Sequence, residues 1–156
     1  EVRKVAAEFP DVQLEEVIID AMAALIIRDP TRFDVIVTGN MFGDILSDEA
    51  SHLSGSLGLA GSDNAGHDLC VAQALHGSAP DIAGKDKANP TSLILSAAMM
   101  LEWMGRRHGS DALARAAAAI EAAVDAALSN PETRTADLKG PLGTTAFTRI
   151  VIDKLG

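Results

Sequence analysis

The feature that most constrains the fold is an alternation of strand-like and helix-like segments in the first third of the chain. Residues 33–38 (FDVIVT) are rich in β-branched side chains and are followed by Gly39, as is typical of a strand that ends in a turn. A shorter run at 17–19 predicts an earlier strand, and helical spacing is present over 21–28 and 40–53. Strands that alternate with helices predict an α/β fold with parallel pairing.

The remainder of the chain predicts one strand followed by three helices. These four elements are expected at residues 70–75, 91–108, 110–127 and from 144 onward. Residues 54–68 are rich in Gly, Ser, Asn and Asp and are expected to form turns. Asn89 and Pro90 suit the start of the first long helix, with Asn as its cap and Pro at its first position.

The charge balance excludes several classes of partner. The chain has 22 Asp and Glu against 13 Lys and Arg, a net charge of −9, whereas binding to nucleic acid requires clustered cations. No apolar run is long enough to span a bilayer, and the single Cys70 cannot form a disulfide within the chain. We therefore expect a cytoplasmic globular protein that binds neither nucleic acid nor membranes.

Two aspartates in the helix predicted at 40–53 form a candidate metal site. Asp44 and Asp48 are four residues apart, so their carboxylates lie on one face of the helix, one turn apart. Like charges at this spacing are unfavourable unless a cation lies between them, and Mg²⁺ or Mn²⁺ prefers carboxylate oxygens. The alternative is a solvated acidic face, with Asp44 near the helix N-terminus.

The loop at 76–85 (HGSAPDIAGK) carries more polar and glycine residues than a strand-to-helix connection needs. Gly77 would let the backbone approach a ligand closely. A carboxylate such as Asp81 can accept both hydroxyls of an adenosine ribose and repels a 2′-phosphate, so it favours NAD over NADP. The Rossmann fingerprint G-x-G-x-x-G is absent. His76, taken alone, favours a core histidine over a ligand contact.

The 76–85 loop resembles the adenosine-binding loop of the β-decarboxylating dehydrogenases, and residues 40–51 (NMFGDILSDEAS) resemble the metal-binding helix of the same family. Its members act on 3-isopropylmalate, isocitrate, homoisocitrate or tartrate. The resemblance covers nearly the whole chain but only the latter part of a family member. It implies a fragment of a two-domain α/β fold, with a mixed sheet flanked by helices, that is not a Rossmann fold. Residues 1–54 would belong to the smaller metal and dimerisation domain, and 55–156 to the larger cofactor-binding domain.

The resemblance also assigns roles to individual residues. It implies a Mg²⁺ or Mn²⁺ site shared across a homodimer, with Asp44 and Asp48 from one subunit and Asp20 from the other. The apolar residues near them are then expected to pack against the two-fold mate: Met41, Ile45, Leu46, Ala24 and Leu25. The expected NAD contacts are His76, Gly77, Ser78, Ala79, Asp81, Ile82 and Asn89. The catalytic Tyr and Lys of the family lie upstream of residue 1, so no catalytic residue is expected here and the fragment alone is expected to be inactive.

The implied activity is NAD- and metal-dependent oxidative decarboxylation of a 2-hydroxy acid that bears a β-carboxylate. Residues 55–58 (GSLG) are similar to 3-isopropylmalate dehydrogenases of leucine biosynthesis, whereas 86–91 and 134–138 are similar to NAD-dependent isocitrate dehydrogenases. The segment nearer the expected active site favours 3-isopropylmalate, and isocitrate, homoisocitrate and tartrate are the alternatives. A non-catalytic regulatory subunit is the alternative of another class, although such subunits tend to lose the metal ligands. One position departs from the family, because Gln73 stands where a Glu is usual.

Overall fold

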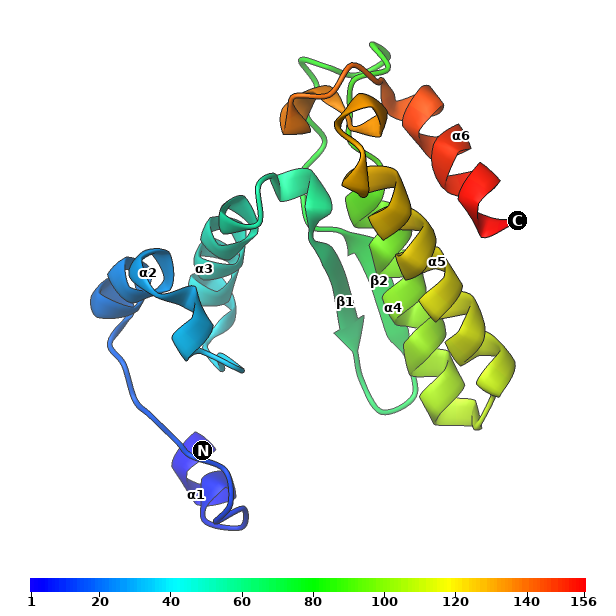
Figure 1. Cartoon of the computed structure of the whole chain (residues 1–156). Helices are drawn as coiled ribbons and strands as arrows, with labels where there is room; N and C mark the ends of the chain where they lie inside the picture. The colour runs from blue at the N-terminus through cyan, green and yellow to red at the C-terminus, as the bar shows by residue number, and fades with distance from the viewer. The chain divides into compact units, whose positions relative to one another are not determined.

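The computed structural model describes all 156 residues and divides into two compact units, Glu1–Ala50 and Ser51–Gly156 (Figure 1). The helices are α1 (Val2–Ala6), α2 (Ile19–Arg28), α3 (Asn40–Leu53), α4 (Thr91–His108), α5 (Asp111–Ser129) and α6 (Thr144–Leu155). Two strands, β1 (Gly61–Ala65) and β2 (Cys70–Ala74), and four short 3₁₀ turns complete the chain. None of the helices combines the length and the apolar character that a membrane span requires. The assignment of 1–54 and 55–156 to two domains of the family fold stays a prediction.

The core of the first unit lies between α2 and α3. Met22 and Ile26 are one turn apart on α2, and both are buried together with Leu46 of α3. Leu46 therefore packs in the core of its own unit, and the prediction that it packs against a two-fold mate is wrong. Met41 and Ile45, by contrast, are 66% and 58% exposed.

Both strands predicted in the first unit are wrong. Ile19 begins α2 instead of ending a strand, and residues 33–38 pair with no other segment. Phe33, the first residue of this segment, does have extended backbone angles. A strand also needs a hydrogen-bonded neighbour, which these 156 residues do not provide.

The only sheet is an antiparallel hairpin in the second unit, so the predicted parallel pairing of strands is absent from these residues. Strand β1 pairs with β2 in a register that runs from Gly61 opposite Ala74 to Ala65 opposite Cys70. The sequence of β1, GSDNA, is poor in strand-forming residues, and for this reason the segment was expected to form turns. Packing on α4 stabilises it: the Ser96 hydroxyl of α4 accepts from the Ser62 N–H, and a Cβ at Gly61 would lie 2.8 Å from the Met99 sulfur.

Three helices form the rest of the second unit, where α4 packs against the hairpin and α5 (Figure 1). Helix α4 has the predicted bounds, and Gly109 ends it in a left-handed conformation with φ 63°. Helix α6 begins at the predicted Thr144, and α5 extends two residues beyond its expected end. The buried core that joins α5 and α6 comprises Ala123, Val124, Ala127, Phe147 and Val151.

Candidate functional site

The candidate metal face lies on α3, which places Asp44 and Asp48 one helical turn apart. Both side chains are exposed and neither takes part in an ion pair. Asn40 is the first residue of the helix, and its side-chain amide donates to Asp44 Oδ2 at 3.3 Å. Two exposed carboxylates suit a hard divalent cation, but such an ion needs further oxygen ligands.

Asp20 is not brought near this face within the chain. It lies exposed in the first turn of α2, where its Oδ1 accepts from the Ala21 N–H at 2.7 Å. No group of three or more His, Cys, Asp or Glu side chains in the structure is arranged to hold a metal ion. The donor set of this chain therefore fits two ligands of the expected site, and the contribution of Asp20 from a partner subunit stays a prediction.

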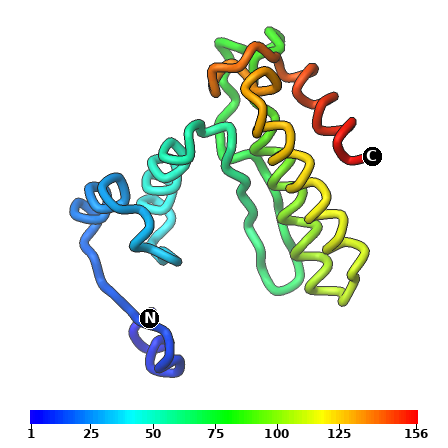
Figure 2. The backbone as a smooth tube through the Cα atoms, viewed as in Figure 1, coloured from blue at the N-terminus to red at the C-terminus, as the bar shows by residue number.

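Strand β2 leads directly into the 76–85 loop, the expected cofactor site. Residues 76–88 contain no helix or strand, as predicted (Figure 2), and β2 ends at Ala74, one residue before its predicted end. The loop folds on itself, since the Ile82 N–H donates to the Ala79 carbonyl and the Lys85 ammonium to the Asp81 carbonyl at 2.7 Å. Ala79 and Gly84 have positive φ values of 41° and 72°. The chain thus forms a tight, irregular turn with its polar groups outward.

The side chains of this loop leave an accessible polar surface. The Asp81 carboxylate is exposed and has no hydrogen-bond or ion-pair partner, and Ser78 is also exposed. A Cβ at Gly77 would meet no atom within 4 Å, so space is open at that backbone. His76 is half-buried and its Nδ1 lies 2.9 Å from the Gly77 carbonyl, so it is not a core histidine. Ile82 is half-buried.

Asn89 ends the loop and is buried. Its Oδ1 accepts from the Thr91 N–H at 3.0 Å, but Pro90 rather than Asn89 is at the N-cap position of α4, one residue later than predicted. Its Nδ2 donates to Asp137 Oδ2 at 2.9 Å, so the side chain is committed to the protein itself. The backbone N–H and carbonyl of Asn89 have no partner within the chain and are the groups left for a ligand.

A polar cluster that the sequence did not reveal is centred on Asp137. Its carboxylate accepts from Ser56 Oγ at 2.5 Å, from Asn89 Nδ2 and from Thr135 Oγ1 at 2.5 Å. Partial burial raises the pKa of Asp137, but the hydrogen bonds outweigh it and hold the pKa below its usual range. The partners Ser56 and Asn89 are 81 and 48 residues away, so no local pattern could have indicated the cluster.

Asp86 forms a second anchor that the sequence did not reveal. Its Oδ1 accepts from both the N–H and the hydroxyl of Thr145, at 2.8 and 2.7 Å. These two hydrogen bonds lower the pKa of the Asp86 carboxyl. The approach is so close that a Cβ at Gly143 would lie 2.4 Å from the Asp86 carbonyl oxygen, so only glycine fits there.

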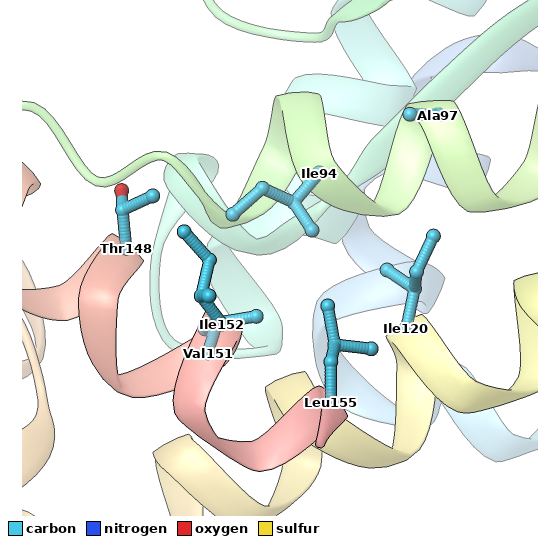
Figure 3. Close-up of a pocket in the computed structure, with 7 residues that line it drawn as sticks. All are labelled: Ile94, Ala97, Ile120, Thr148, Val151, Ile152 and Leu155. Atoms are coloured by element: carbon cyan, nitrogen blue, oxygen red, sulfur yellow. The ribbon is translucent and has the colours of Figure 1, made fainter.

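Two other features of the second unit do not suit polar-ligand chemistry. Burial and the nearby Asp63 carboxylate raise the pKa of the half-buried Cys70, which agrees with an inert thiol. A groove of about 230 Å³ lies among α4, α5 and α6 (Figure 3). Its lining is aliphatic except for Thr148, so it offers nothing to bind a charged dinucleotide: Ile94, Ala97, Ile120, Thr148, Val151, Ile152 and Leu155.

Known proteins resemble this chain over nearly its whole length. It is 49% identical over 154 residues to an isocitrate/homoisocitrate dehydrogenase of Thermus thermophilus, covering 99% of this chain and 44% of that protein. It is 50% identical over 153 residues to a 3-isopropylmalate dehydrogenase of Bacillus thuringiensis, covering 97% of this chain and 41% of that protein. The chain thus spans less than half the length of these curated relatives.

The same similarity is present among solved structures. The isocitrate dehydrogenase of Methylococcus capsulatus matches with a TM-score of 0.89 and 42% sequence identity, over 98% of this chain and 44% of that one. The α/β arrangement described above is therefore one part of a larger fold. The family model described as isocitrate/isopropylmalate dehydrogenase matches residues 1–155. The chain belongs to the isocitrate/isopropylmalate dehydrogenase family.

Proposed function

We propose that this chain supplies the NAD-binding loop and part of the metal site of a dehydrogenase that oxidatively decarboxylates a 2-hydroxy acid bearing a β-carboxylate. The observation that carries the proposal is the free, exposed carboxylate of Asp81 on an open loop. An aspartate already paired within the protein would have less capacity left for a ligand, whereas this one can accept hydrogen bonds from two hydroxyls.

The proposed cofactor contacts divide into three kinds. The Asp81 carboxylate accepts the two ribose hydroxyls and selects against the 2′-phosphate of NADP. His76, Ser78 and Ile82 give polar and apolar contacts beside it, while Gly77 and Ala79 give only backbone. Asn89 contributes through its backbone N–H and carbonyl, because Asp137 and the Thr91 N–H occupy its side chain.

The proposed metal is Mg²⁺ or Mn²⁺, held by Asp44 and Asp48 together with Asp20 of the partner subunit in a homodimer. When bound, such an ion acidifies the substrate hydroxyl and stabilises negative charge as CO₂ leaves. The role of this chain is to hold the ion: α3 fixes the two carboxylates on one face, at the spacing of one turn. Their exposure leaves room for substrate oxygens.

The proposed substrate is 3-isopropylmalate, which would place the protein in leucine biosynthesis in the cytoplasm. Isocitrate or homoisocitrate is the alternative, because relatives of both names are about equally similar to this chain, at 50% and 49% identity. The distinction rests on residues outside the metal face and the cofactor loop, since both classes of enzyme need the same two sites.

Turnover by the protein that carries this chain tests the proposal. NAD reduction is measured at 340 nm with 3-isopropylmalate, isocitrate, homoisocitrate or tartrate, with Mn²⁺ and after its removal by EDTA. We expect one hydroxy acid to be oxidised, and the activity to disappear with EDTA and return with Mn²⁺. Absence of turnover with all four acids, in a protein that binds neither NAD nor Mn²⁺, would exclude the enzyme and leave the regulatory-subunit alternative.

A further inference from the structure

The end of the cofactor loop is attached to the first turn of α6 by several hydrogen bonds. Asp86 Oδ1 accepts from the Thr145 N–H and hydroxyl, and the Asp86 carbonyl accepts from the Thr144 N–H at 3.1 Å. The Thr144 hydroxyl also donates to the Ala88 carbonyl. We call these contacts, between residues 86–88 and Thr144–Thr145, the loop clamp.

The clamp gives hydrogen-bond partners both to the first turn of α6 and to the end of the loop. Helix α6 has Gly143 at its N-cap position, which offers no side chain to the free N–H groups of the first turn. Asp86 takes that place from 59 residues away, as an N-capping aspartate does, and its φ of 53° is tolerated better by Asp or Asn than by most residues. The helix is itself fixed, because Phe147 and Val151 are buried in the core.

The rest of the loop has few other attachments to the second unit. The hydrogen bonds that involve His76, Ile82 and Lys85 all join groups within the loop. At its beginning, the Leu75 N–H donates to the Ser92 hydroxyl at 3.0 Å. The loop therefore lies between two anchored ends, and the position of Asp81 depends on them.

We propose that Asp86 and Thr145 are positioning residues for NAD: the clamp holds the loop in the conformation in which Asp81 meets the adenosine ribose. The inference rests on the proposed function, which assigns the loop to NAD. A loop that is ordered before binding loses less conformational freedom when the cofactor arrives, and this raises affinity.

The sign of the change in NAD affinity distinguishes the clamp from a simple effect of the Asp86 charge. NAD carries a negatively charged pyrophosphate, so removing the negative charge of Asp86 would strengthen binding if charge alone mattered. The clamp predicts the opposite sign for Asp86→Ala. Thr145→Val changes no charge and removes only the hydroxyl, and Asp86→Asn removes the charge but keeps an oxygen acceptor for both Thr145 donors.

The test is calorimetric titration with NAD of the protein that carries this chain. We expect Asp86→Ala to weaken NAD binding about three- to tenfold and Thr145→Val about threefold, because each net hydrogen bond contributes roughly 0.5–1.5 kcal/mol. Asp86→Asn should remain within about twofold of wild type. Thr148→Val is the matched control, since the Thr148 hydroxyl donates within α6 to Thr144 and not to the loop. Hydrogen exchange should be faster over 76–85 in the two weakened variants.

The outcomes separate the clamp from the function beneath it. If wild type binds NAD and Thr145→Val and Asp86→Ala bind it as tightly or more tightly, the clamp is wrong while the proposed function stands. If wild type itself does not bind NAD, both are wrong. Should Asp86→Ala fail to fold, the comparison of Thr145→Val with Thr148→Val decides. In kinetics, the clamp predicts a raised KM for NAD with unchanged kcat.

Discussion

Single aspartates in this chain belong to two groups that differ in their hydrogen bonds. Asp44, Asp48 and Asp81 are exposed and have at most one weak partner, so they can bind ligands. Asp86 and Asp137 accept two or three hydrogen bonds each, most of them from distant segments, and their pKa values are lowered by those bonds. The first group is available to bind a metal ion or cofactor, and the second joins segments of the chain that are distant in sequence.

The metal assignment is tested at one ligand. We expect Asp44→Asn to weaken Mn²⁺ binding by at least about tenfold, because even a residue that only orients a metal ligand contributes roughly 10- to 100-fold. Isothermal titration with Mn²⁺ measures this, with the exposed Asp34→Asn as the control. Equal Mn²⁺ affinity in the two variants would show that the α3 face is merely solvated.

We expect a Thr→Val substitution to have different effects on stability at Thr91 and at Thr135. Both side chains are fully buried, but the Thr91 hydroxyl has no partner, whereas the Thr135 hydroxyl donates to Asp137. We expect Thr91→Val to leave the free energy of unfolding unchanged or raise it by about 1 kcal/mol, since it removes an unsatisfied polar group. Thr135→Val should lower it by about 1–3 kcal/mol. Urea denaturation measures both values. If Thr91→Val lowered the free energy of unfolding as much as Thr135→Val does, the reasoning would be refuted.

At the scale of elements, the helices and most of the loops were predictable, whereas among the predicted strands only the one at 70–75 formed, as β2. The bounds of α4 and the start of α6 follow from local signals: apolar spacing, the Asn89–Pro90 pair before α4 and a terminal glycine. The segment 33–38 has the local preference of a strand and no partner, while β1 lacks that preference and is paired. Strand formation depends on neighbours that a local pattern does not contain.

The candidate site shows the same division. Asp81 and the 76–88 loop were recognisable because the unusual residues are consecutive, and Asp44 and Asp48 because helical spacing relates them. The roles of Asp86 and Asp137 were not recognisable from the sequence, because they depend on hydrogen-bond partners that lie 48–81 residues away. Tertiary contacts alone identify them.

The Asp137 cluster predicts a pH dependence of stability. Because the hydrogen bonds lower the folded pKa of Asp137, the stabilisation is complete above the ordinary carboxyl pKa and is lost as pH falls through the lowered value. We expect Asp137→Asn to reduce the free energy of unfolding at neutral pH by about 1 kcal/mol, a modest value because the group is partly solvated, and to flatten its acid dependence.

Urea denaturation at several pH values from neutral to acidic measures this dependence. The control is Asp125→Asn, which changes an exposed aspartate on α5 without a hydrogen-bond partner. If the acid limb of Asp137→Asn parallels that of Asp125→Asn, the carboxylate does not join the three segments.

At the scale of the whole molecule, the first unit leaves apolar side chains uncovered. Met41 and Ile45 are exposed, on the helix that carries the metal face. We expect the double substitution Met41→Glu and Ile45→Glu to convert a dimer into a monomer in light scattering, because it places charges in the expected interface. Ala122→Glu, at an exposed position of α5, is the control. A wild-type monomer, or a dimer that tolerates both charges, would exclude the shared metal site.

The central claim is that the free carboxylate of Asp81 binds the ribose hydroxyls of NAD, and the preference for NAD over NADP tests it most directly. Calorimetric titration with NAD and NADP is made on wild type and on the double variant Asp81→Lys with Ile82→Tyr. We predict that wild type prefers NAD and that the variant shifts toward NADP by about tenfold to a hundredfold, since each charge-assisted contact contributes roughly 1.5–3 kcal/mol. Equal affinity of wild type for NADP and NAD would contradict the account.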